Sequence, residues 1–220
     1  MNGVDVSTRY TMRSREMYQR YATYIFRVVK AKMGNYLIFF PSYRFMEDVY
    51  QEFTQLLASD EEEMELVIQQ KHMDEEEREN FLRAFEMGRE KSLIGFGVLG
   101  GIFSEGIDLT NEKLIGTLII GTGLPQVCNE REILKSYFDQ KGLYGFDYAY
   151  RYPGMNKVLQ AAGRVIRTED DRGVILLLDE RFQKEKGKEI FPKEWADCER
   201  CRLDIVEEKI RLFWEKQTDN

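Results

Sequence analysis

The sequence of 220 residues has few of the residues that build disulfide frameworks and metal sites. It contains three cysteines, Cys128, Cys198 and Cys201, and one histidine, His72. Three cysteines are too few for a disulfide framework, and their odd number indicates a reducing compartment. The single Cys-x-x-Cys has no second pair to complete the four ligands of a zinc or iron–sulfur site. We therefore expect no metal in this chain and a surface position for His72.

Long apolar runs and a positive net charge are also absent. The N-terminal stretch MNGVDVSTRY has no apolar core of a signal peptide, and Ser92–Ser104 is too short and too rich in glycine for a membrane span. The formal net charge of -7 argues against a protein that coats nucleic acid non-specifically, although a local basic strip is compatible with it. We expect a cytoplasmic protein with no membrane partner.

A phosphate-binding loop is missing as well. The string G-x-x-x-x-G-K-[ST] occurs nowhere in the sequence. Such a loop cradles the nucleotide phosphates in P-loop ATPases. The apolar run Leu176–Glu180 ends in Asp-Glu like a Walker B segment, but without that loop a self-contained ATPase is not expected.

The composition indicates a globular chain, with 43% hydrophobic and 13% aromatic residues. Five apolar runs are typical of buried strands, and helical patterns lie between them. The expected strands are Tyr36–Phe40, Glu65–Gln69, Leu93–Leu99, Thr117–Gly121 and Val174–Leu178. Strands that alternate with helices predict an α/β fold, a parallel sheet with helices on both faces in a single domain. Ligands of such sheets bind where the carboxyl ends of the strands lie.

Four segments show helical patterns outside the most informative region. Apolar residues recur at helical spacing in Arg13–Lys32 and Arg44–Leu57. Asp74 followed by Glu77 is typical of a helix start. The last stretch, Lys193–Lys216, predicts a C-terminal helix that docks on the sheet.

The segment Tyr152–Gly173 carries the most informative pattern, because Pro153 favours a helix start and an apolar stripe follows. The stripe consists of Met155, Val158, Leu159, Ala162 and Ile166. At about 3.6 residues per turn, Gln160, Arg164 and Arg167 fall together on the opposite side of this helix.

This face suits phosphate, and Gly163 beside it permits close approach. A guanidinium stays charged and grips two phosphate oxygens at once, while an amide orients a water or a γ-phosphate oxygen. Arginines supplied by a second domain neutralise the charge that develops in phosphoryl transfer. Spacing alone leaves an ordinary solvent-exposed helix face as an equal alternative.

Four strings, in order, resemble motifs of superfamily 2 DNA helicases of the DinG/XPD type. LIFFPSY at about 37–43 resembles motif IV, GGIFSEGIDL at 100–109 resembles motif V, and QAAGRVIR at 160–167 resembles the Q-x-x-G-R-x-x-R of motif VI. LLLDERF at 176–182 matches the strand that follows motif VI. VSTRYTMRS at 6–14 resembles the entry into the domain. The resemblance implies a second RecA-like motor domain over residues 1–220, with a C-terminal helical extension at about 193–216.

The resemblance also implies a nucleotide site shared with a first motor domain outside this chain. ATP and Mg²⁺ would rest on the P-loop of that first domain, and Arg164, Arg167 and Gln160 would act on the phosphates. Residues expected at the nucleotide cleft are Glu105, Gly106, Asp108 and Gly163. Any iron–sulfur cluster would belong to the first domain. Asp179 and Arg181 are expected to make structural contacts.

Single-stranded DNA is the implied polymer, with 5′ to 3′ translocation. Ser42, Tyr43 and Arg44 follow the first strand, and Ser104 lies in motif V; all four are candidates for DNA contacts. Ser42 is also a suitable N-cap for the next helix, which is the commoner use of such a residue. A rival hypothesis is a stand-alone, non-catalytic RecA-like module that binds nucleic acid or a partner.

Overall fold

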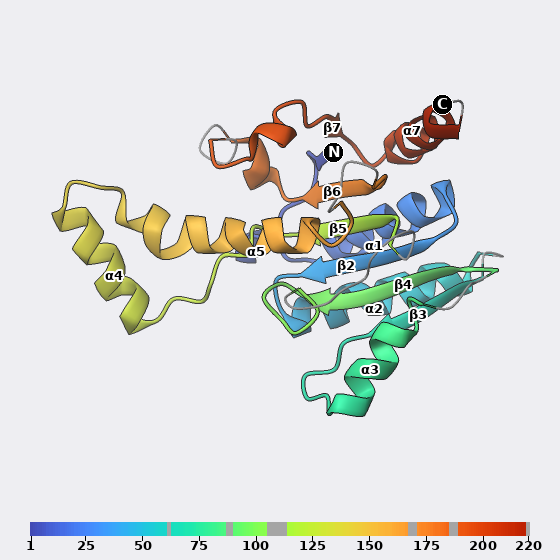
Figure 1. Ribbon diagram of the computed structural model, residues 1–220, viewed down its shortest axis with the longest axis horizontal. Helices are drawn as coiled ribbons and strands as arrows, with labels where there is room; N and C mark the ends of the chain where they lie inside the picture. The colour runs from blue at the N-terminus through green and yellow to red at the C-terminus, as the bar shows by residue number, and fades with distance from the viewer. Residues whose placement is uncertain (61–62, 87–89, 105–113, 167–170, 185–188, 219–220) are drawn as a thin grey trace.

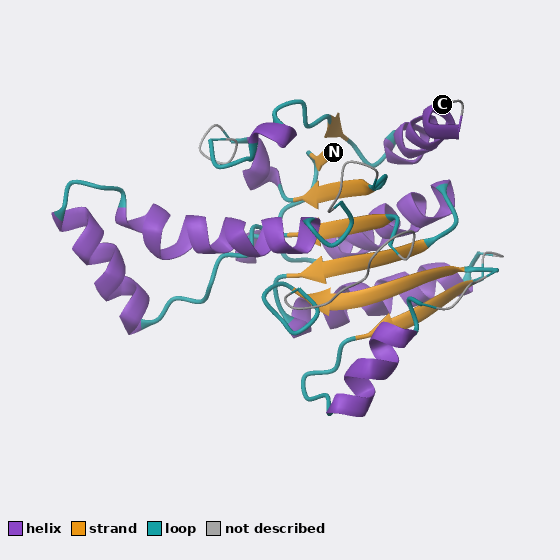
Figure 2. Cartoon of the chain, in the orientation of Figure 1, coloured by secondary structure: helices purple, strands orange, loops and turns teal. Residues whose placement is uncertain are grey.

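The structure, a computed structural model, describes residues 1–60, 63–86, 90–104, 114–166, 171–184 and 189–218. One sheet of seven parallel strands runs through it in the order β3-β4-β2-β5-β6-β1-β7 (Figures 1 and 2). The strands are β1 Asn2–Gly3, β2 Asn35–Phe40, β3 Met64–Ile68, β4 Ser92–Val98, β5 Gly116–Ile120, β6 Val174–Leu178 and β7 Arg200–Cys201. The predicted α/β class is confirmed, and each of the five expected strands lies within one residue of an observed one.

Helices connect the strands, and α1, α2 and α3 begin at residues whose side chains cap them. The α-helices are α1 Arg15–Ala31, α2 Tyr43–Ala58, α3 Glu75–Arg83, α4 Asn129–Gln140, α5 Tyr152–Ala162 and α7 Val206–Thr218. Short 3-10 helices span η1 Tyr10–Met12, η4 Glu180–Gln183 and η5 Lys193–Trp195, and η3 Asp147–Arg151 is a π-helix. The side chain of Ser14 caps α1, and Asp74 and Glu77 form the expected reciprocal capping box of α3.

Helices cover both faces of the sheet, as Figure 1 shows. On one face, α1, α2 and α7 pack over strand residues such as Ile38 and Phe40. On the other face, α3 and α5 pack over Leu37 and Phe39. This alternation follows from the strand period of two residues, and it explains why nearly every residue of β2 is apolar and buried.

The predicted C-terminal helix is wrong in its first half. Where a helix from Lys193 was expected, the chain forms η5 and then β7, and only Val206–Thr218 is helical. The backbone N–H of Asn2 donates to the carbonyl of Glu199 at 2.7 Å, and β7 pairs with β1. Because this pairing joins residues near the two ends of the sequence, no local sequence pattern predicts it. The second half, α7, packs on α1, and its Val206 and Ile210 join the hydrophobic core on that face of the sheet.

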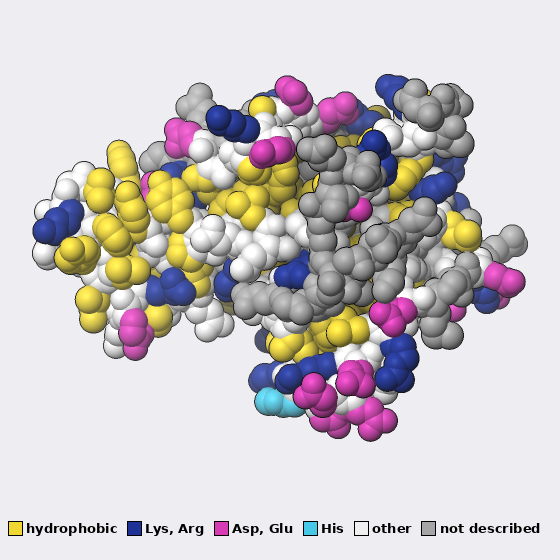
Figure 3. All heavy atoms as spheres, viewed as in Figure 1, with side chains coloured by type: hydrophobic (Ala, Val, Ile, Leu, Met, Phe, Trp, Pro, Cys, Tyr) yellow, Lys and Arg dark blue, Asp and Glu magenta, His cyan; other side chains and the backbone are white. Residues whose placement is uncertain are grey.

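An arm made of α4 and η3 projects beyond the sheet between β5 and α5 (Figure 1). None of the residues of α4 is buried in the described structure. Hydrogen bonds from Arg131 to the carbonyl of Ala149 and from Tyr150 to Glu132 tie the two helices of the arm together. Apolar side chains gather on the visible face of this arm (Figure 3). On α4, Ile133 is 70% exposed. Among the helices that the structure describes, none is long and apolar enough to cross a membrane.

The packing of β4 against β2 and against the turn that follows α3 predicts the effect of a methyl group added at Gly95. A Cβ atom at this position would lie 2.6 Å from Phe85 Cζ and 2.8 Å from Leu37 Cδ1. We expect Gly95→Ala to lower the free energy of unfolding by about 1–3 kcal/mol, because a close-packed core does not absorb an added methyl group. Urea denaturation measures this difference.

Gly163→Ala serves as the matched control. A Cβ there meets its nearest neighbour, the carbonyl oxygen of Leu159, at an ordinary 3.4 Å. Its free energy of unfolding should stay within about 0.5 kcal/mol of the parent. Equal stability of the two variants would show that β4 is not tightly packed around Gly95.

Candidate functional site

The carboxyl ends of β2, β3, β4, β5 and β6 lie at one edge of the sheet, since these strands are parallel. Their arrowheads point the same way in Figure 2. The loops that leave this edge contain the predicted motif IV and motif V strings. The described residues of motif VI, 160–166, lie at the end of α5 and in the turn after it, beside Gly173 at the amino end of β6. From there Arg164 reaches Ser104 in the loop that follows β4. The candidate site therefore comprises this edge together with the contact of Arg164 with Ser104.

The loop after β4 is a tight turn built on glycine. Gly100 has a φ of 71°, and a Cβ at Gly100 would lie 2.9 Å from the Nζ atom of Lys157. The backbone N–H of Gly101 donates to the carbonyl of Val98, and that of Ser104 donates to the carbonyl of Gly101. The loop is thus closed by its own backbone and brings the amine of Lys157 against it.

Ser104 lies at the end of this turn with its side chain buried. Its hydroxyl donates to the carbonyl of Gly101 at 2.8 Å. A DNA phosphate at Ser104 would have to bind elsewhere than at this hydroxyl, or displace the bond. Three further predicted residues of this loop, Glu105, Gly106 and Asp108, lie outside the described residues.

The helix that was expected to carry the amide and both arginines ends earlier than predicted. It stops at Ala162, with Gly163 as its C-cap. The chain continues as a tighter turn, in which the N–H of Arg164 donates to the carbonyl of Ala161. Ile166, expected on the apolar stripe, is 42% exposed. The helical spacing used for the prediction therefore applies to Gln160, which lies in α5, but not to the residues after Gly163.

Arg164 connects the turn after α5 with the loop after β4. Its side chain is half-buried, and Nη2 donates to the carbonyl oxygen of Ser104 at 3.1 Å. Gln160 and Gly163 are exposed on the same stretch of chain, and Arg167 lies outside the described residues. The described geometry thus brings Arg164 to the motif V loop and leaves Gln160 open to solvent.

Of the three candidate residues after β2, Ser42 has a structural role, and Tyr43 and Arg44 are at least partly accessible to a ligand. The Ser42 hydroxyl accepts from the backbone N–H of Phe45 at 3.3 Å, so Ser42 is the N-cap of α2. Tyr43 is half-buried, and Arg44 is exposed. N-terminal amides of a helix suit an anion, so the N-cap does not exclude phosphate contact.

Gln69, which the sequence analysis did not single out, connects these loops. It follows β3, is 2% exposed, and accepts from the backbone N–H of Val98 at 2.9 Å. Its Nε2 lies 2.9 Å from the hydroxyl oxygen of Tyr43. An amide at the carboxyl end of a strand was visible in the sequence, but nothing local distinguished it from a surface residue.

A groove of about 540 Å³ opens beside this contact. Tyr43, Gln69, Gly100 and Gly101 are among the residues that line it. The side chains of Lys71, His72 and Arg78 also line it, and all three are exposed. The position of His72 agrees with the predicted surface role. Basic groups thus surround a polar hollow at the ligand edge.

The expected structural role of Asp179 is confirmed. Its carboxylate is fully buried and accepts from the N–H and the hydroxyl of Thr8 and from the guanidinium of Arg181. Burial raises the pKa of this carboxyl, but the hydrogen bonds and charge of Arg181 and the bonds from Thr8 outweigh it. The pKa therefore lies below its ordinary value. This cluster fixes the N-terminal segment to the end of β6.

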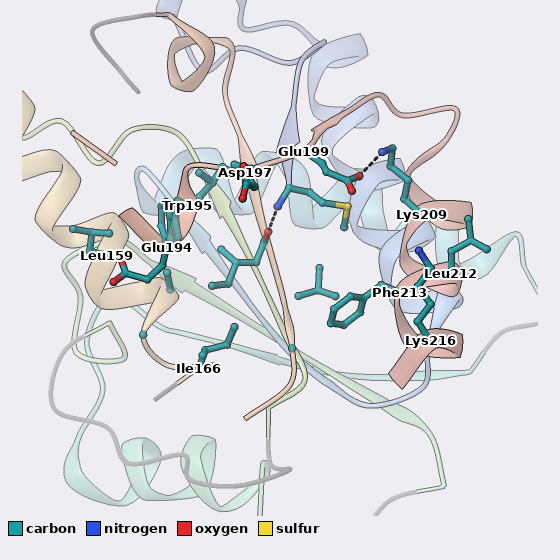
Figure 4. A pocket seen from close by; sticks show the side chains of 18 residues that line it. Leu159, Ile166, Glu194, Trp195, Asp197, Glu199, Lys209, Leu212, Phe213 and Lys216 are labelled. Carbon is teal, nitrogen blue, oxygen red and sulfur yellow. Dashed lines mark hydrogen bonds and ion pairs between the residues drawn. The ribbon is translucent and has the colours of Figure 1, made fainter. Parts of the chain in front are cut away.

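A larger cavity, of about 790 Å³, lies away from the ligand edge (Figure 4). It opens beside Val174 at the amino end of β6, between the end of α5 and α7. Leu159, Trp195 and Phe213 give it apolar walls, and Lys209 pairs with Glu199 at its rim. Gly163 is the single predicted site residue among those described as lining it, so this cavity does not gather the predicted chemistry.

Comparisons with known proteins agree with this geometry. The family model of the helicase C-terminal domain matches residues 25–198. The chain is similar to the ATP-dependent DNA helicase XPD of Sulfolobus acidocaldarius, with 30% identity over 187 residues, which cover 82% of this chain and 31% of that protein. It is also similar to the general transcription and DNA repair factor IIH helicase subunit XPD/RAD3 of Saccharomyces cerevisiae, with 27% identity over 84% of this chain and 24% of that protein.

A solved structure of an XPD helicase shares the fold. Its TM-score is 0.72 at 24% identity, and the alignment covers 91% of this chain and 34% of that one. The chain therefore spans about a third or less of the length of these relatives.

The buried Asp179 predicts a pH-dependent contribution to stability. Asp179→Asn should lower the free energy of unfolding by about 2–4 kcal/mol at neutral pH, because Arg181 loses its buried partner. The lowered pKa means that the ionised carboxylate stabilises the fold above its ordinary pKa of 3.8. This stability is lost as the pH falls through the lower folded value. The difference between variant and parent should therefore narrow below about pH 4 in denaturation curves.

Glu180→Gln is the control for this prediction. The Glu180 side chain is 38% exposed and pairs with Arg9. Its loss should cost less than about 1 kcal/mol. If the effect of Asp179→Asn stayed constant into acid, the carboxylate would not be the ionised group that holds this cluster.

Proposed function

Because this chain belongs to the helicase C-terminal domain family and is of the XPD type, we propose that it is the second RecA-like motor domain of an ATP-dependent DNA helicase. The proposal assigns residues 1–220 to this one domain. A first motor domain carries the P-loop, and this domain closes over the nucleotide with the segment of Arg164 and the loop that follows β4. The observation that carries the proposal is the contact of Arg164 with Ser104, which brings the arginine segment to the motif V loop.

The described residues around Arg164 offer hydrogen-bond donors to a nucleotide's phosphates. Arg164 and the exposed amide of Gln160 are donors suited to phosphate oxygens. Gly163 is exposed and leaves the end of α5 open. ATP with Mg²⁺ supplies the phosphoryl group that is transferred. In this proposal Arg164 and Arg167 neutralise the charge that develops on it, and Gln160 orients the γ-phosphate region.

The remaining cleft residues complete the proposed nucleotide contacts. Glu105 and Asp108 accept from a ribose hydroxyl or pair with an arginine, and Gly106 allows the backbone to approach. None of these three belongs to the described residues, so their roles rest on the family resemblance. Any iron–sulfur cluster of the whole protein is assigned to the first domain.

Single-stranded DNA is the proposed polymer on this domain. The amino end of α2 offers backbone amides at Ser42 and Tyr43 and the exposed cation of Arg44. Ser104 contributes through the backbone of its loop, because its hydroxyl is bonded to Gly101. Opening and closing of the two motor domains shifts the grip on the strand and moves it 5′ to 3′.

Substitution of Arg164 in the full-length protein tests the finger role. Arg164→Ala should lower the ATPase rate stimulated by single-stranded DNA by at least about 10³-fold, because an arginine finger contributes that much to phosphoryl transfer. A steady-state ATPase assay measures it. Arg211→Ala is the control, since Arg211 lies on α7 and pairs with Glu207 on the same helix. An unchanged ATPase rate for Arg164→Ala would refute the proposed role of Arg164 as an arginine finger.

The isolated 220-residue chain provides a second test. It should hydrolyse no ATP above background, because its sequence has no phosphate-binding loop. Its affinity for a single-stranded oligonucleotide should be weak and should fall steeply with salt, given the net charge of -7. Turnover that depends on single-stranded DNA, and that disappears in Arg164→Ala, would contradict the assignment of the P-loop to another domain.

A further inference from the structure

The buried amide of Gln69 has only one orientation that fits its neighbours. A backbone N–H is always a donor, so the atom that faces the N–H of Val98 at 2.9 Å must be the oxygen Oε1. The other end of the amide, Nε2, then faces the Tyr43 hydroxyl oxygen at 2.9 Å. Because Nε2 is a donor, Tyr43 must accept this bond.

The surrounding glycines hold the amide in this position. A Cβ at Gly101 would lie 2.9 Å from Nε2 of Gln69, and a Cβ at Gly97 would lie 3.3 Å from its Oε1. The amide fills the space that these two residues leave. Gln69 is 2% exposed, so water does not compete freely for either bond.

This arrangement directs the proton of the Tyr43 hydroxyl away from the protein side of the contact. A phenol has one proton to donate, and Gln69 offers that oxygen a donor, not an acceptor. Tyr43 is half-buried and lines the groove, so its proton is directed to an acceptor on the groove side.

Charges around the groove favour an anionic acceptor. Lys71 and Arg78 line it, and the amine of Lys157 lies close to Gly100, which also lines it. The carboxylate of Asp74, also in the lining, accepts from the backbone N–H of Glu77 at 2.8 Å as the cap of α3. Exposed glutamates on the first turn of α3 lie nearby and limit the attraction.

We propose that Gln69 is a positioning residue that presets Tyr43 as a hydrogen-bond donor to a phosphate oxygen of single-stranded DNA in this groove. The inference rests on the proposed function and deepens it, because it assigns Tyr43 to the phosphate backbone and not to base stacking. The phosphodiester lies along Gly100 and Gly101, with Lys71 and Arg78 as its counter-charges.

Three variants of the full-length protein test the proposal in fluorescence anisotropy titrations with a labelled oligothymidylate. Tyr43→Phe keeps the ring and removes the proton, and should weaken binding by about 5- to 10-fold. Tyr43→Ala should weaken it to the same extent, because the ring itself contributes little. Gln69→Glu should match them, since a carboxylate there accepts from both Val98 and Tyr43 and turns the tyrosine proton away from the groove.

Matched controls separate this effect from charge and from misfolding. Gln70→Glu adds the same charge at the next residue, which is exposed and also lines the groove, and so measures the effect of charge alone. It should weaken binding clearly less than Gln69→Glu, because it leaves the Tyr43 proton directed to the groove. Thermal unfolding identifies a Gln69→Glu variant that fails to fold, and Tyr43→Phe then decides the question alone. Tyr43→Phe with unchanged affinity would overturn the proposal. So would a loss confined to Tyr43→Ala, which would make Tyr43 a stacking platform.

Two further readouts identify the ligand and keep the proposed function separate. Inorganic phosphate at constant ionic strength should not displace the oligonucleotide; if it does, and equally in the parent and Tyr43→Phe, the groove is a site for free anions. At saturating DNA, Tyr43→Phe should keep the parent ATPase kcat and raise only the DNA concentration required. A parent protein with no ATPase stimulated by DNA would refute the helicase assignment, while the anisotropy result would still decide the role of Tyr43.

Discussion

Parallel pairing of the five central strands is the constraint on which the rest of the structure depends. The pairing places the loops after β2, β3, β4 and β6 at one edge, although they are far apart in the sequence. Side chains above and below the strands are apolar and sealed by helices on both faces. The buried polar side chains of Gln69 and Asp179 lie where strands end, and that edge is a place where the chain can bind an anionic ligand.

Two buried polar groups hold this edge in shape. Asp179 ties the segment at Thr8 to the end of β6 through five hydrogen bonds with Thr8 and Arg181. Gln69 ties the end of β4 to Tyr43 at the start of α2. Each group would be costly to bury without its partners, and each is fully engaged by backbone and side-chain donors or acceptors. The loops between them are thus positioned before any ligand arrives.

Sequence patterns predicted the strands well because each is a short apolar run with both faces covered. They failed where a distant contact or a helix end decides the structure. β7 forms within the expected C-terminal helix because it pairs with β1 at the other end of the chain. The helix carrying Gln160 ends at Ala162, so Arg164 reaches Ser104 from a turn and not from a helical face. Gln69 was missed because its importance lies in partners supplied by two other strand ends.

The central claim is that the segment of Arg164 closes over ATP held by another motor domain. It is tested most directly by a structure of the full-length protein with Mg²⁺ and a transition-state analogue of ATP hydrolysis. The account predicts that the Arg164 guanidinium leaves or shares its bond with Ser104 and lies within roughly 3 Å of an oxygen or fluorine at the γ position. An analogue bound on the first domain while Arg164 faces solvent, or keeps only its present contacts, would contradict it.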